Sequence, residues 1–449
     1  MSKAIDNIKN IKLVKTLTNI WRIEDLRSRI LITLLFVAIY RFGSYVVLPG
    51  IDTEALEGLK NQTEGGLMSL LDMFSGGAFS KASIFALGIM PYISASIVMQ
   101  LLGIAVPYFQ KMQREGESGR RKMSQYTRYL TVPILVFQGI FYLINLKNQT
   151  AGTALYSSLD WNMFILYATI ILAAGSMFVL WLGERITDKG IGNGVSIIIM
   201  IGIIARFPEA VIQEFSTRIG GQGGLVMFLI EIVLFLAVIA AAILLVQGVR
   251  QVPVNYAKKI AGARQIGGAR QYIPLKPYAA NVMPIIFAQA IMFIPVTLAQ
   301  FSGSKLNPVV SQLIDNNSFI YNLIFAILII LFTYLYTAIT INPVQMAEDM
   351  KRNNGFIPGI KPGKDTADYI DKVMSRITFP GSLFLAIIAI LPAFAGIFGI
   401  QREFAAFFGG TSLLILVGVV LDTLMQIESH LMMRHYDGLL DTGRVRGEH

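Results

Sequence analysis

Cysteine is absent from this chain of 449 residues, and charged residues make up only 15% of it. Without cysteine there can be no disulfide, iron–sulfur cluster or thiolate metal site. The three histidines, His430, His435 and His449, lie near the end of the chain and do not form a metal-binding pattern. Within the apolar stretches no two carboxylates share a helix face, and no histidine accompanies a serine or carboxylate at a catalytic spacing. We therefore expect no enzymatic activity, no cofactor and no metal.

Apolar residues are abundant in this chain, as its low content of charged residues implies. They make up 54% of the chain, and its mean hydropathy is +0.59. A membrane crossing needs about 20 mostly apolar residues, and ten stretches of the chain reach roughly that length. They are approximately residues 30–48, 82–104, 127–146, 161–182, 193–211, 225–249, 279–300, 319–341, 377–396 and 410–432. The sequence thus predicts an all-α integral membrane protein with ten transmembrane helices.

The positions of lysine and arginine predict how these spans are oriented. Of the 38 basic residues, 30 lie in the two termini and in alternate loops, and only 7 lie in the remaining loops. Because Lys and Arg accumulate on the cytoplasmic side, both termini are predicted to be cytoplasmic. Residues 1–29 fit an amphipathic helix on an anionic membrane surface and, equally well, a solvated helix that binds a partner. A membrane domain at 30–432 and a cytoplasmic tail at 433–449 follow it.

The stretch Leu67–Leu102 departs from the simple pattern of spans. Its first part, up to about Ser80, is too short and too rich in glycine to cross the bilayer, so we expect it to re-enter without spanning. Irregular backbone at membrane depth is tolerated only where it is buried in protein or lines a cavity. Pro91 and the polar residues that follow it would also be unusual in contact with lipid. We interpret the stretch as the lining of a path through the protein, and a re-entrant packing loop fits it equally well.

Charge inside a span usually marks a functional site, and Arg41, Glu231 and Asp422 are the candidates. Arg41 lies near the outer half of the first span, where its charged head could snorkel to the interface or cap carbonyl groups. Glu231 lies near the outer start of the sixth span, so we expect it to be exposed at the membrane interface. Asp422 lies deeper and could pair with the backbone or with a partner.

Seven segments carry a recognisable pattern. They are VVLPGID (46–52), LDMFSGGAFSKASIFALGIMPYISASIVMQLL (71–102), TDKGIGNGVSIIIMIGI (187–203), PVNYAKK (253–259), YIPLK (272–276), FIPGIKPGKDTADYIDKV (356–373) and FFGGTSLLILVGVVLD (407–422). In this order they resemble the SecY family, the central subunits of the bacterial protein-conducting channel. The resemblance runs from about Ile20 to Met433, nearly the whole chain.

The resemblance implies a fold and a function. The fold would be ten helices in two inverted five-helix halves, about 30–211 and 225–432, with a short re-entrant plug. The function would be to move unfolded secretory polypeptides across the bacterial plasma membrane and to release transmembrane segments sideways into lipid. The implied plug residues are Leu70, Leu71, Asp72, Met73, Phe74, Ser75, Gly76, Gly77, Ala78, Phe79 and Ser80. The implied pore ring is Ile89, Ile93, Ile199, Ile286 and Ile415.

A lateral gate is also implied, between the second and third spans on one side and the seventh and eighth on the other. Its polar candidates are Ser94, Ser96, Gln100 and Gln138, which are equally well explained as ordinary helix-packing residues. Without the resemblance, the pore-ring isoleucines would be taken as core or lipid contacts.

Two basic loops, 250–277 and 351–376, are longer than a helix connection needs. Such loops also act as topology determinants near lipid headgroups. By resemblance they dock the ribosome or the SecA motor, through Arg250, Lys258, Lys259 and Lys361. The family usually has Arg at the position of Lys361, and Lys cannot form the planar two-point contact of Arg. The further implied partners are the small membrane subunits SecE and SecG, polypeptides that carry signal sequences, and the lipid bilayer.

Two other classes of membrane protein are alternatives. A secondary transporter with inverted repeats would need a binding site with paired charges near the midplane, and the sequence reveals none. An intramembrane enzyme would need a catalytic grouping, which the sequence also lacks. The sequence therefore favours a channel that works without an active site.

Overall fold

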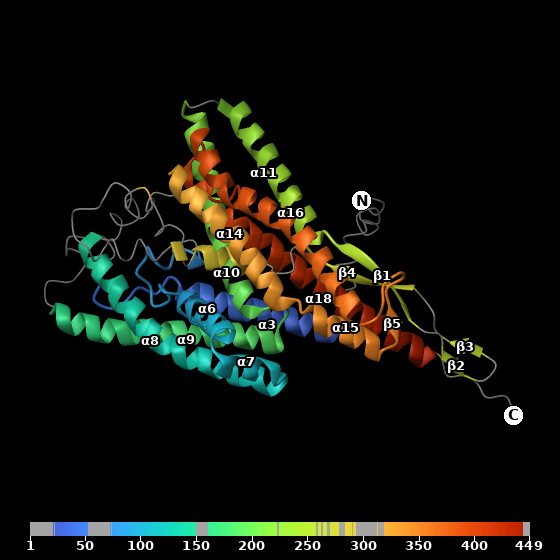
Figure 1. Ribbon diagram of the computed structural model, residues 1–449. Coiled ribbons are helices and arrows are strands. Elements are labelled where there is room, and N and C mark those ends of the chain that lie inside the picture. Colours follow the sequence, from blue (N-terminus) through green and yellow to red (C-terminus); the bar gives the residue numbers. More distant parts are fainter. Residues whose placement is uncertain are drawn as a thin grey trace. The chain divides into compact units, whose positions relative to one another are not determined.

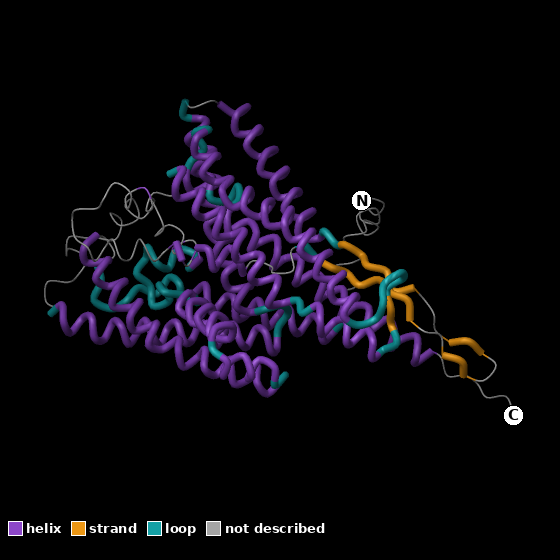
Figure 2. Tube along the Cα trace, in the orientation of Figure 1, coloured by secondary structure: helices purple, strands orange, loops and turns teal. Residues whose placement is uncertain are grey.

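The computed structural model describes residues 21, 23–52, 72, 74–149, 160–221, 224–256, 259–261, 264–266, 270–277, 283–289, 291–292, 312 and 318–442 (Figures 1 and 2). The chain forms two compact units. The first comprises Met1–Pro208 and Val419–His449, and the second comprises Glu209–Gly418. The end of the last predicted span, 410–432, therefore belongs to the first unit and its beginning to the second. The predicted N-terminal helix, 1–29, lies largely outside the described residues.

The first unit is a set of packed helices. In it, α8 contacts both α6 and α9, while α3 packs against α9 and the short α7 against α6 and α8. The helices that lie wholly in this unit are α3 Glu24–Gly43, α6 Met90–Ala105, α7 Pro107–Arg114, α8 Glu117–Gln149 and α9 Trp161–Lys189. The unit also includes the first part of α10, which runs over Gly194–Ile219, and the end of α18, which runs over Gly410–Thr442.

The second unit combines helices with a small sheet. Its central helix is α16, which contacts α11, α14, α15 and α17. The helix bounds are α11 Gly224–Gln247, α14 Phe319–Thr340, α15 Pro343–Arg352, α16 Lys364–Ile397 and α17 Arg402–Ala405. The strands are β1 Arg250–Tyr256, β2 Lys259–Ala261, β3 Arg264–Ile266, β4 Arg270–Leu275 and β5 Gly355–Phe356.

The helical membrane fold is confirmed. Among the described residues, seven helices are long and apolar enough to cross a membrane, and the bent pair α6–α7 makes an eighth if it is one span. The first predicted span corresponds to α3, which begins and ends several residues earlier than expected. The seventh predicted span, 279–300, is described only at 283–289 and 291–292.

The second span begins later than the sequence suggested. We expected it at Ala82, but residues 82–89 continue the irregular backbone, and α6 begins only at Met90. Ala82 and Gly88 have positive φ angles of 46° and 51°, which interrupt a right-handed helix. Pro91 lies in the first turn of α6, where its missing N–H is harmless. It therefore starts the helix and does not break a longer one.

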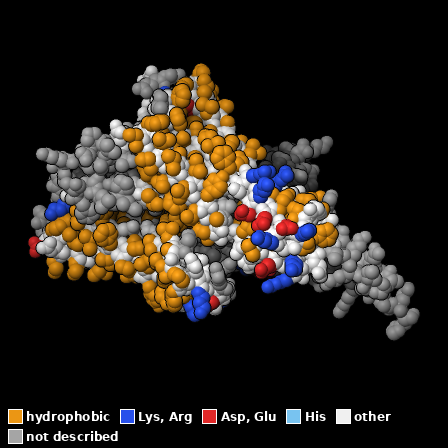
Figure 3. Space-filling view, in the orientation of Figure 1, with side chains coloured by type: hydrophobic (Ala, Val, Ile, Leu, Met, Phe, Trp, Pro, Cys, Tyr) orange, Lys and Arg blue, Asp and Glu red, His pale blue; other side chains and the backbone are white. Residues whose placement is uncertain are grey.

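The two basic loops are joined in one folded module, which the sequence did not predict. Strands β4, β1 and β5 form an antiparallel sheet in which Arg250 pairs with Leu275 and Asn255 pairs with Phe356. Val252 and Val254 alternate with more exposed neighbours, as in a sheet with one buried face. This face packs into a core with α15 and the start of α16. Figure 3 shows Lys, Arg, Asp and Glu side chains gathered over this sheet module, whereas α11, α14 and α16 present mainly apolar side chains.

The burial of Val254 predicts that the sheet module depends on it. Its side chain is 0% exposed, so Val254→Asp would place an unpaired carboxylate in the core at a cost of several kcal/mol. We expect rapid cleavage of 250–277 by limited proteolysis, while the membrane helices stay intact. The matched control is Tyr272→Asp in β4, since Tyr272 is exposed. Equal cleavage of both variants would contradict the packing described.

Candidate functional site

The re-entrant segment, residues 72–89, folds into a tight turn closed by its own polar groups. Gly76 and Gly77 have φ angles of 65° and 86°, which favour glycine and explain the Ser-Gly-Gly sequence. The Gly77 N–H donates to the carbonyl of Asp72 at 2.8 Å, and the Ser75 hydroxyl donates to the same oxygen at 3.1 Å. The Ser80 N–H donates to Asp72 Oδ1 at 2.7 Å. Asp72 is thus the acceptor around which the turn closes.

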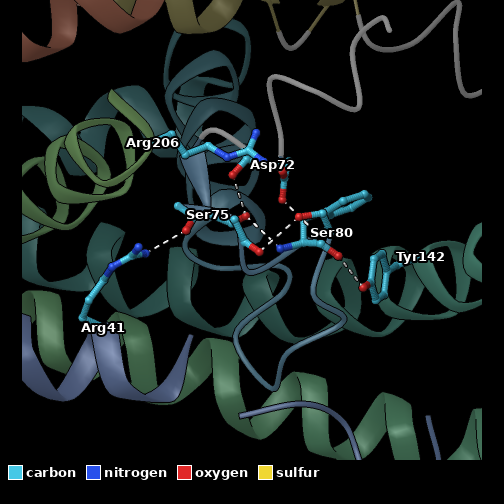
Figure 4. Close-up of polar contacts among 9 residues, drawn as sticks. Arg41, Asp72, Ser75, Ser80, Tyr142 and Arg206 are labelled. Atoms are coloured by element: carbon cyan, nitrogen blue, oxygen red, sulfur yellow. Dashed lines mark hydrogen bonds and ion pairs between the residues drawn. The ribbon is translucent and has the colours of Figure 1, made fainter. Parts of the chain in front are cut away.

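Side chains from three separate helices hold this turn (Figure 4). Arg206 of α10 pairs through Nη2 with Asp72 Oδ2 at 2.6 Å. Arg41 of α3 donates to the Gly76 carbonyl at 2.7 Å, and the Tyr142 hydroxyl of α8 donates to the Phe79 carbonyl at 2.8 Å. The predicted capping role of Arg41 is therefore confirmed. Each of these contacts satisfies an oxygen of a buried residue of the turn.

The turn also lies directly against the backbone of α10. A Cβ added to Gly202 would come within 2.5 Å of the Phe74 carbonyl oxygen and 3.3 Å of the Gly76 amide nitrogen. Such contacts are too close for any side chain larger than hydrogen. Gly202, within the sequence segment IIIMIGI, therefore provides the space in which the turn lies.

The second half of the segment is bound to the chain that follows α3. Val47 and Ser83 form an antiparallel bridge, with the Ile84 N–H donating to Val46 and the Leu48 N–H donating to Ala82, each at 2.9 Å. Phe79 packs its ring edge-on to Tyr142 within a core shared with α8 and α9. The segment is therefore buried in protein, as the constraint on irregular backbone at membrane depth requires.

The structure places the predicted plug residues in this turn, as far as it describes them. Asp72 and residues 74–80 are all buried, and Leu70, Leu71 and Met73 lie outside the described residues.

The predicted pore-ring residues are distributed over both units. In the first unit, Ile89 immediately precedes α6, Ile93 lies in its first turn, and Ile199 lies in α10. In the second unit, Ile286 lies in the helical stretch 283–289 and Ile415 in α18. Ile89, Ile199 and Ile415 are buried, while Ile93 and Ile286 are half-buried.

The predicted gate residues lie on two neighbouring helices of the first unit, and all four are half-buried. Ser94, Ser96 and Gln100 belong to α6, and Gln138 belongs to α8. The Ser94 hydroxyl donates to Met90 of its own helix, and Gln100 Nε2 donates to Ser96 at 3.3 Å. These two hydrogen bonds run along α6 and do not join it to a neighbouring helix.

The predicted docking residues belong to the sheet module or its edge. Arg250 begins β1 and is exposed, and Lys361 is exposed in the turn before α16. That turn is fixed by a 2.8 Å hydrogen bond from the Thr366 hydroxyl to the Lys361 carbonyl. Lys258 and the side chain of Lys259 lie outside the described residues.

Sequence reasoning missed a buried charge cluster in the second unit, and its prediction for Glu231 was wrong. Glu231 is only 1% exposed and pairs with Arg218 Nη2 at 2.5 Å. Arg218 also donates through Nε to Glu214 at 2.8 Å and through Nη2 to the Gly399 carbonyl at 2.9 Å, while Glu214 accepts from the Gln401 N–H. The spacing of Glu214 and Arg218, four residues apart at the end of a helix, was the available signal.

These contacts indicate what the site can do. In the described part of the chain, no three His, Cys, Asp or Glu residues are grouped to hold a metal. Both arginines at the re-entrant segment bind oxygens of the protein itself. The arrangement is a short segment seated by a few directional contacts, which suits a part that is held in place and released.

Comparison with known proteins decides the family. The family model for SecY matches residues 83–424. The protein translocase subunit SecY of Halalkalibacterium halodurans is 43% identical over 437 residues, covering 95% of this chain and 100% of its own. The corresponding subunit of Streptomyces scabiei is 42% identical, covering 94% and 98%. This chain belongs to the SecY family.

Solved structures support the fold. A protein-conducting channel has a TM-score of 0.62 at 17% identity, covering 94% of this chain and 95% of that one. A SecY whose plug domain stabilises the closed state of its channel and maintains a membrane seal has a TM-score of 0.61, also at 17% identity, covering 94% and 95%. Sec61 from a canine ribosome–channel complex has a TM-score of 0.60 at 15% identity, with the same two coverages. The SecY channel fold therefore extends over nearly the whole chain.

Gly202 gives a direct test of how this SecY chain seats its re-entrant segment. Gly202→Ala would force apart α10 and the Phe74 carbonyl, so amide exchange at residues 74–80 should quicken by roughly tenfold. Hydrogen-exchange mass spectrometry measures this rate. Gly396→Ala is the matched control, because nothing lies within 4 Å of its added Cβ. Unchanged exchange in Gly202→Ala would refute the tight contact.

The charge cluster predicts a large loss of stability from one substitution. Arg218→Met leaves two buried carboxylates without their cation and should cost about 3–5 kcal/mol. Thermal unfolding of the purified protein in detergent measures the change. In the control Arg128→Met, the lost pair with Glu184 is partly exposed, so the expected cost is below about 1 kcal/mol. Equal shifts for the two variants would show that the cluster adds no special stability.

Proposed function

We propose that this chain is the central channel subunit of a bacterial protein translocase. It moves unfolded secretory polypeptides across the plasma membrane and releases transmembrane segments laterally into the bilayer. The observation that carries this proposal is the buried re-entrant segment, held in the first unit by three helices through a few polar contacts. We assign residues 70–80 as the plug, and the similar SecY structure whose plug domain maintains a membrane seal supports the presence of such a segment.

The proposed pore ring consists of Ile89, Ile93, Ile199, Ile286 and Ile415. A narrow collar of branched aliphatic side chains makes few hydrogen bonds to water or ions, so it closes by dewetting. It can part around an extended polypeptide without binding any side chain tightly. Burial of three of these residues and partial burial of the other two support a position away from lipid.

The proposed lateral gate uses Ser94, Ser96, Gln100 and Gln138. The Ser94 and Gln100 hydrogen bonds that join residues of α6 to one another would survive if that helix moved as a rigid body. Hydrogen bonds between membrane helices average only about 0.6 kcal/mol, so a seam of this kind opens reversibly.

The proposed partners fit the sheet module. Its exposed basic residues include Arg250 and Lys361, and Lys258 and Lys259 are further proposed docking residues. Cationic loops suit ribosomal RNA and acidic protein surfaces, so we propose docking of the ribosome and of the SecA motor there. Sec61 has been solved in a ribosome–channel complex, which supports the first of these. SecE and SecG complete the proposed translocase.

In this proposal the chain is not an enzyme, and its termini are cytoplasmic. Translocation is driven by the motor, the ribosome or the membrane potential. The buried charges do not favour the transporter alternative. Asp72, Arg206, Glu214 and Arg218 are each bound to other groups of the protein, including backbone N–H and C=O groups, so their role is to fix the structure.

A polar substitution in the ring tests the proposed function. Ile415→Asn would hydrate the collar, so the variant should accept substrates with defective signal sequences. Combined with deletion of 70–80, it should raise ion flux roughly tenfold or more. Translocation assays and ion efflux from liposomes measure these effects. Val420→Asn, at a more exposed site on the same helix, is the matched control.

Two outcomes would overturn the proposal. One is unchanged ion flux together with saturable uptake of a small solute, which would favour a transporter. The other is failure of a stalled secretory chain to crosslink to photoreactive groups at Ile93 and Ile286.

A further inference from the structure

The two carboxylate oxygens of Asp72 have different tasks. Oδ1 accepts the Ser80 N–H at 2.7 Å and so closes the turn on itself. Oδ2 pairs with Arg206 Nη2 at 2.6 Å and so attaches the closed turn to α10. The Asp72 side chain is 2% exposed and that of Arg206 is 17% exposed, which places the pair in a largely water-free setting. One side chain therefore shapes the segment and fastens it.

The other side-chain attachments have a different character. Tyr40, Arg41 and Tyr142 all donate to backbone carbonyls, those of Ser75, Gly76 and Phe79 respectively. A backbone carbonyl is present whatever the side chain, and none of these bonds joins two charges. Among the described residues, the ion pair of Asp72 and Arg206 is thus the one salt bridge that fastens the segment to a helix.

We propose that the Asp72–Arg206 ion pair is the latch that keeps the plug seated, with Arg206 acting as a positioning residue. This inference rests on the proposed function of residues 70–80 as a plug. It assigns the closed state to a specific side-chain pair and predicts that the pair sets how often the plug leaves.

An ionic latch suits a part that must both hold and release. When one partner is removed, the other remains as an unpaired charge in a poorly hydrated site, which is strongly unfavourable. When the plug of the unsubstituted chain leaves its seat, the charges of Asp72 and Arg206 both reach water. Their hydration then compensates most of the attraction that the pair loses. Apolar packing lacks this compensation, because apolar surface that becomes exposed to water stays unfavourable. The pair therefore stabilises the closed state while keeping the plug releasable.

The absence of cysteine makes the plug position directly measurable. Ala78 is 0% exposed in the seated plug, and Ala78→Cys would be the only thiol in the chain. The full chain, purified with its co-expressed membrane partners in detergent, is treated with a large polar maleimide. The rate at which label appears on this chain, followed by mass spectrometry, reports how often the plug leaves.

Asp72→Asn is the informative single variant, because it retains an oxygen for the Ser80 N–H and removes the charge that pairs with Arg206. We expect Asp72→Asn and Arg206→Gln each to raise the labelling rate roughly tenfold. In the double variant, the labelling rate should rise by much less than the product of the two single-variant factors, because both substitutions remove the same interaction.

The control removes a different ion pair from the same unit. Arg128 and Glu184 join α8 to α9 with partly exposed side chains, so Arg128→Gln and Glu184→Gln should leave labelling unchanged. Labelling at the parental rate in both Asp72→Asn and Arg206→Gln would overturn the latch. So would independent, multiplicative effects in the double variant. Retention of the elution volume on size exclusion and of the helical circular dichroism shows that each variant is folded.

Failure of the latch is distinguishable from failure of the proposed function. Labelling measures plug position without any translocated polypeptide, so it tests the ion pair alone. Parental labelling with normal polypeptide transport would refute the latch and keep the channel. Fast labelling in Asp72→Asn with no transport by the parent would support the ion pair as a fastening and refute the translocation function.

Discussion

Every backbone N–H and C=O group at membrane depth needs a partner, because hydrocarbon offers none. Helices meet this requirement within themselves, but the turn at residues 72–80 cannot. Its oxygens are instead satisfied by Arg206, Arg41 and Tyr142 and by N–H groups of the turn. The position of the segment is therefore decided by side chains on α3, α8 and α10, and those helices must lie close together for the turn to exist.

Charge in the membrane part of this protein is used to join elements. Asp72 and Arg206 connect the turn to α10 in the first unit. Glu214, Arg218 and Glu231 connect α10, α11 and the loop before α17 in the second. Both groups also bind backbone atoms of irregular chain, which compensates part of the cost of burying charge. They are local fastenings, and the surrounding helices remain almost free of ionisable groups.

The sheet module shows a third use of polar structure. Two loops far apart in the sequence are joined through β1 and β5, and an apolar core beneath them includes Ile357 and Ile370. This support holds Lys361 on a fixed turn. A flexible loop would lose more conformational entropy on binding than such a turn does. The pairing of β1 with β5 therefore joins the described parts of the two loops in one folded unit.

The sequence by itself determined the membrane class and the family, because length, hydropathy and the order of motifs can be read along the chain. It also offered carbonyl capping as one of two roles for Arg41, and the structure shows that contact. Only the tertiary structure decided that α6 begins at Met90, that Glu231 is buried and that Arg206 meets Asp72. These outcomes depend on which helices are neighbours, and residues 134 positions apart carry no local sign that they will form an ion pair.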